Sequence, residues 1–287
     1  MHIDPMMIAA GLLVGLVVGM TGMGGGALMT PILVLFFGVA PLSAVSSDLV
    51  VSLFMKPVGA IVHLRRGTAN LRLAAWLCVG SVPAAFAGAL ALRALGRAGG
   101  GVNGIVQISL GAALLLAVGT MLVKEALPRR ASSATEAAGS AAGPIAGADP
   151  LAIRPWPTAA LGVLGGLVVG MTSVGSGSLI IVGLLLMHPR LTAGRLVGTD
   201  LVQAVPLVAS AALGHLLFGD VSVALTGSLL LGALPGAWAG ARLSAVAPQA
   251  LVRRALAFVL LASGLKLVGV PTPAVGAALV GSAALAI

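Results

Sequence analysis

The chain of 287 residues has few charged, aromatic and cysteine residues. Only 8% of its residues are charged and 59% are hydrophobic, which is more apolar material than a water-soluble domain of this size must bury. A single cysteine excludes an intrachain disulfide framework and a thiolate metal cluster. With no tyrosine, six phenylalanines and three tryptophans, few aromatic rings are available to stack on nucleic-acid bases. These shortages argue against a soluble enzyme, a zinc or redox protein and a nucleic-acid-binding protein.

The apolar residues are grouped into blocks of about 15 to 22 residues, a length that crosses or half-crosses a lipid bilayer. The 41 glycines fit this class, because small residues let helices pack closely in lipid. The net charge of +9 is spread over helix ends and therefore reports topology rather than a nucleic-acid partner. The sequence predicts an all-α polytopic membrane protein embedded in a lipid bilayer.

The chain is an internal duplication. Residues 15–21, GLVVGMT, recur identically at 166–172, and the offset of 151 becomes 152 after one inserted residue. At the second offset Asp48 matches Asp200, and His63 matches His215. We therefore expect two membrane repeats at 1–123 and 157–270. A disordered cytoplasmic linker at 124–156 joins them, and a C-terminal helix at 271–287 follows.

Each repeat contains two short apolar segments joined by a Gly-rich turn, followed by three longer segments. The short pairs cover 7–21 with 26–38 and 157–172 with 177–188, and the longer segments cover 43–64, 72–93, 103–123, 195–216, 221–243 and 251–270. The linker is rich in Ala, Ser, Gly and Pro and shows no periodicity, as is typical of disordered segments.

The distribution of basic residues predicts that the two repeats are inverted in the membrane. With the linker in the cytoplasm, twelve of the sixteen lysines and arginines lie on the inner side. One loop carries Arg65 and Arg66 in the first repeat, whereas its counterpart in the second has Leu217 and Phe218. Inversion requires an odd number of crossings per repeat, which holds if the short pair is a hairpin and the three longer helices cross. Inverted repeats with interrupted helices are typical of transporters, which bind substrate near the midplane.

The two Gly-rich turns are the candidate substrate site. Each opens into a short helix, whose free amide groups and dipole favour an anion. Close helix packing or tight turning is the alternative use of the glycines. The candidate substrate-binding residues are Thr21, Gly22, Met23, Gly24, Gly25 and Gly26 in the first turn and Thr172, Ser173, Gly175, Ser176, Gly177 and Ser178 in the second.

Lys56 is also a candidate substrate-binding residue, because the segmentation places it well inside a helix, where an ionisable group is costly. It could pair with the transported anion. The alternatives are a lysine that is held by Asp48 or by backbone carbonyls, or one that snorkels. A direct pair with Asp48 within one helix is unfavourable, because the two residues are eight positions apart, two turns away and about 80° rotated.

Five further polar residues are candidates for ion coupling or gating: Asp48, Asp200, Gln203, His63 and His215. Each aspartate lies about one turn into its segment and follows a hydroxyl residue, Ser47 or Thr199, that could help to cap the helix. A proton relay and structural capping or bracing of the turns both remain open for the aspartates. The histidines serve either proton coupling or helix-end hydrogen bonding, and inversion separates them too far for a shared metal site. Gln203 makes either an interhelical bond or a ligand contact.

An intramembrane serine hydrolase is the competing class, because Ser176 lies within a GSG and His215 could act as a base. No positioned acid completes this set, and the first repeat has Gly25 at the matching position. We therefore expect no enzyme activity, no catalytic residue, no metal and no cofactor.

The sequence resembles the sulfite exporter TauE/SafE family of bacterial inner-membrane anion carriers over nearly the whole chain outside the linker. The likeness is carried by GMTGMGGGALMTP at 19–31, SDL at 47–49, HLRRG at 63–67 and GSVPA at 80–84, and in the second half by MTSVGSGSL, GTDL at 198–201 and AVPL at 204–207. One departure is Ala69, Asn70 and Leu71, where the family pattern has an aromatic residue after the basic loop.

The resemblance implies transport of sulfite, sulfonates or related small organic anions, coupled to an ion gradient. Together with the duplication it predicts a secondary transporter that exports a small sulfur-containing anion across the bacterial inner membrane by alternating access. An importer of a similar anion or of a small carboxylate is the alternative. A channel and a structural scaffold are further alternatives, and assembly into a homo-oligomer is left open.

Overall fold

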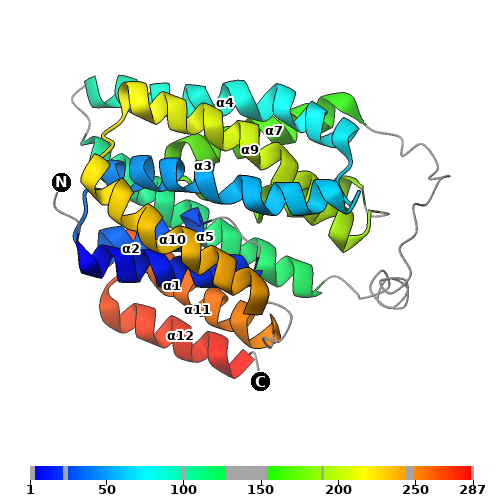
Figure 1. Cartoon of the computed structure of the whole chain (residues 1–287). Helices are drawn as coiled ribbons and strands as arrows, with labels where there is room; N and C mark the ends of the chain where they lie inside the picture. The colour runs from blue at the N-terminus through cyan, green and yellow to red at the C-terminus, as the bar shows by residue number, and fades with distance from the viewer. Residues whose placement is uncertain are drawn as a thin grey trace.

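The computed structural model describes residues 4–21, 25–97, 101–126, 154–188, 191–243 and 249–285. These residues form eleven helices and contain no strand, which confirms the all-α prediction (Figure 1). In the first repeat they are α1 (Pro5–Thr21), α2 (Gly26–Leu35), α3 (Pro41–Arg65), α4 (Leu71–Arg97) and α5 (Val102–Ala126). In the second they are α7 (Pro155–Thr172), α8 (Leu179–Met187), α9 (Ala193–Phe218), α10 (Val223–Leu243) and α11 (Gln249–Leu267), and α12 (Thr272–Leu285) follows.

Helix boundaries differ from the predicted ones at the linker and at the second turn. Because α5 continues to Ala126 and α7 begins at Pro155, both ends of the predicted linker 124–156 are helical. Proline suits the first turn of a helix, where its missing N–H costs no hydrogen bond. The remainder of that prediction, 127–153, lies outside the described residues. Helix α8 begins after the predicted residue 177, because Gly175 and Gly177 have φ values of +120° and +102° that are not helical.

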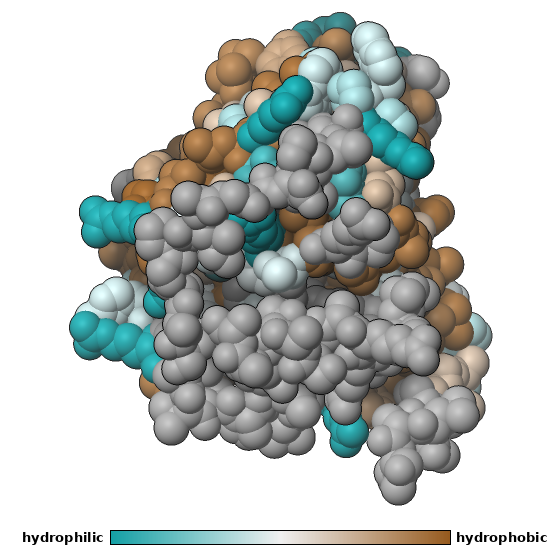
Figure 2. All heavy atoms as spheres, turned by 90° about the vertical axis from the view of Figure 1, so that its right-hand side faces the viewer, coloured by the Kyte–Doolittle hydropathy of each residue, from teal (hydrophilic) through white to brown (hydrophobic). Residues whose placement is uncertain are grey.

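Among the described residues, six helices are long and apolar enough to cross a membrane: α3, α4, α5, α7, α9 and α10. Helix α11 carries three basic residues and is not among them. Large apolar side chains such as Val79, Leu213 and Leu231 are more than half exposed on the outside of the bundle. In Figure 2 hydrophobic residues cover the upper flanks, and hydrophilic side chains project at the end that faces the viewer. This is the surface of a protein whose flanks contact lipid.

The two repeats exchange helices. Helix α1 packs along α10, and its counterpart α7 packs along α4. A Cβ on Gly11 of α1 would collide with the backbone of Leu229, and one on Gly162 of α7 would collide with the backbone of Leu77. Such close contacts between helix backbones require glycine or another very small residue. The helix before each Gly-rich turn is therefore held by the other repeat.

Helices α3 and α9 pack side by side in opposite directions. Near the start of α3, Ser46 Oγ lies 2.7 Å from Nδ1 of His215 in the last turn of α9. A Cβ added to Gly198, near the start of α9, would lie 3.0 Å from Nδ1 of His63, near the end of α3. The colours of Figure 1 agree, because α3 ends on the side at which α9 begins. These two matched helices are therefore antiparallel.

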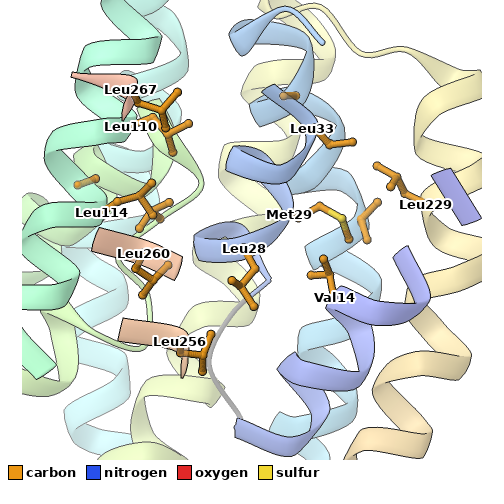
Figure 3. Packing of buried hydrophobic residues seen from close by; sticks show 14 of the residues in the cluster. Val14, Leu28, Met29, Leu33, Leu110, Leu114, Leu229, Leu256, Leu260 and Leu267 are labelled. Carbon is orange, nitrogen blue, oxygen red and sulfur yellow. The ribbon is translucent and has the colours of Figure 1, made fainter. Parts of the chain in front are cut away.

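Two apolar cores support the short helices, and both cores contain residues of both repeats. Figure 3 shows Met29 and Leu33 of α2 facing Val14 of α1 and Leu229 of α10. On the other side of α2, α5 and α11 contribute leucines to the same core. In the second core α8 packs against α5, α7 and α9. Each short helix is thereby fixed by neighbours that come from both copies.

The close contact between α7 and α4 predicts a large difference between two Gly→Ala substitutions. A Cβ on Gly166 would stand 2.8 Å from Ser81 Cα and 3.0 Å from Ala84 Cβ. Overpacking of this kind costs about 2 kcal/mol, so we expect Gly166→Ala to lower the Tm of the purified protein by roughly 5 °C.

Gly119→Ala in α5 is the matched control, because nothing lies within 4 Å of its added Cβ. It should leave the Tm unchanged or raise it, since alanine favours a helix over glycine by about 1 kcal/mol. Equal Tm values for the two variants would contradict the close contact.

Candidate functional site

The described parts of the two Gly-rich turns meet beside α3. Ser173 ends α7 with a left-handed φ of 60°, and the following glycines continue the turn with positive φ. A Cβ on Gly26, at the start of α2, would collide with the carbonyl oxygen of Ser173. Gly22, Met23 and Gly24 of the first turn lie outside the described residues. The structure therefore brings the start of α2 into contact with the second turn.

Asp48 joins the two repeats through one carboxylate oxygen. Its Oδ2 accepts hydrogen bonds from Thr30 Oγ1 of α2 at 3.0 Å and from Ser173 Oγ of the second turn at 2.6 Å. The side chain is fully buried in α3. Hydrogen bonds to a carboxylate are stronger than those between neutral groups. Asp48 therefore braces the second turn against α2 and α3, which was one of the two roles considered for it.

Lys56 lies two turns further along α3 and reaches the same turn. It is buried, with 7% of its surface exposed, and its ammonium group donates a hydrogen bond to Ser176 Oγ. Asp48 and Asp200 both lie within electrostatic range of this ammonium. Thus the lysine is positioned by a hydroxyl of the other repeat, while two carboxylates supply its compensating charge.

Several buried polar atoms around this cluster have no hydrogen-bond partner among the described residues. They are Ser47 Oγ, Asp48 Oδ1 and Ser52 Oγ. A Cβ on Gly25 would stand 3.6 Å from Ser52 Oγ and 3.7 Å from Asp48 Oδ1, in ordinary contact. Leaving a buried polar group unpaired costs about 1–3 kcal/mol, so a cluster of such groups marks a place for a polar ligand or water.

Asp200 and Gln203 bring α9 into this region. Gln203 Oε1 accepts a hydrogen bond from Ser81 Oγ of α4 at 3.1 Å, which is an interhelical bond as considered from the sequence. Asp200 is 2% exposed. The prediction that Ser47 and Thr199 cap their helices is wrong, because α3 begins at Pro41 and α9 at Ala193. Thr199 instead accepts a hydrogen bond from the backbone N–H of Asn70, just before α4.

The two matched threonines that end α1 and α7 bond to their own helices. Thr21 Oγ1 donates to the carbonyl of Val17 at 2.8 Å, and Thr172 Oγ1 donates to that of Val168 at 2.6 Å. Ser178, the last residue of the second turn, is buried with 9% exposure. Among the candidate ligands, Ser173 and Ser176 are the serines whose side chains contact Asp48 and Lys56 of α3.

The two histidines lie at opposite ends of the α3–α9 pair and away from the cluster. His63 Nδ1 is 2.8 Å from Thr68 Oγ1. His215 Nδ1 contacts Ser46, and its Nε2 lies 2.7 Å from the carbonyl oxygen of Gly170. Since His215 contacts Ser46 and Ser176 contacts Lys56, the serine and base of the hydrolase alternative are not paired. The described residues contain no group of three or more His, Cys, Asp or Glu that could hold a metal.

Sequence reasoning missed Thr30, Ser46, Ser52 and Ser81 as members of these networks. Ser52 could have been found, because it lies four residues after Asp48 and therefore on the same face of a helix. Thr30 and Ser81 are single hydroxyls in apolar helices, and only the packing of α2 on α3 and of α4 on α9 reveals their partners.

Helices that cross a membrane, two broken helix pairs and a buried polar cluster at their junction are features of a multi-pass membrane transporter. The chain belongs to the family described as "Sulfite exporter TauE/SafE", whose family model matches residues 7–267. This assignment places it in the bacterial inner membrane and confirms the family resemblance.

Two curated relatives come from Bacillus subtilis (strain 168). "Probable membrane transporter protein YjnA" is 34% identical over 261 residues, which cover 91% of this chain and 98% of that protein. "Probable membrane transporter protein YdhB" is 24% identical over 255 residues, which cover 85% of this chain and 91% of that protein. No solved structure matches the chain. Both relatives are named as probable membrane transporters, and the similarity covers at least 91% of each of them.

The bracing of the second turn by Asp48 predicts that Ser173→Ala destabilises the protein. Removal of a hydrogen bond to a buried carboxylate costs about 1.5–3 kcal/mol. We expect a corresponding loss in the free energy of unfolding, measured by denaturant titration of the purified protein.

Ser178→Ala is the control, because it removes a buried hydroxyl from the same turn for which the structure gives no hydrogen bond. It should cost clearly less than Ser173→Ala. The bracing role of Asp48 fails if the two substitutions have the same effect.

Proposed function

We propose that the protein is a secondary transporter that exports sulfite, a sulfonate or a related small sulfur-containing anion across the inner membrane. The family assignment supports the class of substrate. The observation that carries the proposal is the buried ammonium of Lys56 at the Ser176 hydroxyl, where the second turn meets α3. A buried ionisable group inside a membrane bundle marks a functional site by default.

The donors around Lys56 suit an oxyanion. Sulfite and sulfonate groups present several oxygen acceptors, and an ammonium group with neighbouring hydroxyls offers charge-assisted hydrogen bonds to them. Ser176 and Ser178 flank Gly177, directly before the amino end of α8, where the helix dipole also favours negative charge. We assign substrate binding to Lys56 and to the residues of the two turns.

The aspartates give a physical reason for coupling to protons. Asp48 and Asp200 both lie in electrostatic range of Lys56, so an anion that binds Lys56 is repelled by any ionised carboxylate nearby. Binding of the anion and binding of a proton at these carboxyls therefore favour each other. We assign ion coupling to Asp48 and Asp200, and gating to Gln203 within α9 and to His63 and His215 in the last turns of α3 and α9.

Alternating access is supported by the exchange of helices between the repeats. The antiparallel course of α3 and α9, together with the reciprocal α1–α10 and α7–α4 contacts, is the packing expected of inverted repeats. Rocking of one repeat against the other would then expose the junction of the turns first to one side of the membrane and then to the other.

Flux into proteoliposomes tests the proposed site. We expect saturable uptake of a sulfur oxyanion or small sulfonate that responds to an imposed proton gradient. Lys56→Gln should raise the KM about 10-fold or more, because it removes a charged hydrogen bond of about 1.5–3 kcal/mol, while Lys56→Arg retains part of the affinity.

Lys266→Gln is the control, because this exposed lysine is hydrogen-bonded to Thr272 outside the cluster. Its KM should equal that of the wild type. Unchanged KM in Lys56→Gln would remove Lys56 from the site. Transport of small carboxylates alone, out of a panel that also holds sulfite, thiosulfate and small sulfonates, would favour the alternative importer.

Cysteine labelling tests the inverted topology. In a Cys78→Ser background, Ala69→Cys in the loop after α3 and Val221→Cys in the loop after α9 probe matched positions, which are 152 residues apart. We expect a membrane-impermeant maleimide to label the two cysteines from opposite sides of sealed vesicles. Labelling of both from the same side would contradict inverted repeats.

A further inference from the structure

A second site lies at the end of the bundle where α3 begins and α4 and α9 end. Here the structure has a cavity of about 310 Å³, which is at the small end of the range for ligand pockets. Its walls include the apolar side chains of Leu42, Leu92 and Val102 and two arginines, Arg93 and Arg97. An apolar cavity with two convergent cations suits a ligand with an anionic head and a short apolar part.

The guanidinium of Arg93 is held in place by aromatic rings. Its Cζ lies 4.7 Å from the centroid of the Phe218 ring. Phe218 in turn packs edge-to-face against Phe86, with ring centroids 5.7 Å apart and an interplanar angle of 74°. A cation over an aromatic face is attracted by the ring, yet all of its N–H donors remain able to bond elsewhere. The arginine is thus fixed beside the cavity without using its hydrogen bonds on the ring.

Within the described parts of the chain neither Arg93 nor Arg97 forms a salt bridge. The acidic residue just after the cavity wall, Asp220, is hydrogen-bonded to Ser43. His215, which also lines the cavity, is occupied by Ser46 and by the carbonyl of Gly170. Two unpaired guanidiniums beside apolar walls favour a bound anion, and Arg binds oxyanions in a bidentate way.

We propose that this cavity binds a small amphiphilic anion, with its sulfonate, carboxylate or phosphate head between Arg93 and Arg97 and its apolar part against Leu42, Leu92 and Val102. The site is separate from the cluster at Lys56. Leu42 and Lys56 are fourteen residues apart on α3, which corresponds to roughly 21 Å along the helix. The source of the anion is either a soluble organic anion or the head group of an anionic lipid.

Binding of butanesulfonate to the full-length protein in nanodiscs of zwitterionic lipid tests the proposal. The measurement is equilibrium dialysis with labelled butanesulfonate, repeated in a Lys56→Gln background so that any loss at the central cluster is seen separately. We expect binding in both backgrounds. The double variant Arg93→Gln/Arg97→Gln should raise the Kd at least 10-fold in both, and single Arg97→Gln by a smaller factor.

Arg242→Gln is the matched control. Arg242 also lies over an aromatic ring, with its Cζ 3.6 Å from the centroid of Trp238, but it does not line the cavity. Its Kd should equal that of the wild type. Butanol and butyltrimethylammonium should not compete with butanesulfonate, and sulfate should compete only weakly, since it lacks the apolar part.

Nanodiscs with anionic lipid separate the two sources of the ligand. If anionic lipid displaces butanesulfonate and the double variant abolishes this competition, the site holds a lipid head group. If butanesulfonate binds equally well with and without anionic lipid, the site holds a soluble anion. The proposal is overturned if Lys56→Gln abolishes all binding, if Arg93→Gln/Arg97→Gln leaves the Kd unchanged, or if Arg242→Gln weakens binding as much as the double variant does.

Discussion

The burial of Lys56, Asp48 and Asp200 inside an apolar bundle is the constraint on which the rest of the structure depends. Ionised groups in such surroundings are costly unless they are paired and hydrogen-bonded. No single helix of this protein supplies all the partners, because Asp48 takes donors from α2 and from the turn after α7, and Lys56 takes its acceptor from the same turn. The two repeats must therefore meet at this point for the charged residues to be accommodated.

Close packing of glycines makes that meeting of the repeats feasible. Two turns can approach α3 only if the helices that lead into them are held firmly, and these helices lie against the opposite repeat with backbones in contact. Bulkier residues at the glycines of α7 would push this helix outward and move the second turn, with Ser176, away from Lys56. The glycines that pack α1 and α7 against other helices and the glycines of the turns therefore both contribute to the position of the turns. Close packing and the proposed substrate binding, which were alternatives at the level of sequence, are therefore compatible.

The sequence predicted the frame of the molecule better than it predicted the contacts within the site. The duplication and the apolar blocks placed the helices to within a few residues, because both signals are regular and extend over the whole chain. The contact between Lys56 and Ser176 joins residues that are 120 positions apart, and the sequence around either residue does not predict it. The capping role given to Ser47 and Thr199 failed because both residues lie inside their helices, six residues after the starts at Pro41 and Ala193.

The duplicated frame carries a site that is not itself duplicated. At the offset of 152, Lys56 corresponds to Val208. At the offset of 151, which applies to the turns, Ser176 corresponds to Gly25 and Ser173 to Gly22. The lysine thus lies in the first repeat and the serines lie in the second, while the corresponding positions of the opposite repeats carry no polar side chain. Of these two symmetry-related locations, only one therefore carries a lysine with hydroxyl partners. Because this location is built from both repeats, a movement of one repeat against the other changes the distance between Lys56 and Ser176. The proposed rocking motion would therefore alter the proposed anion site directly.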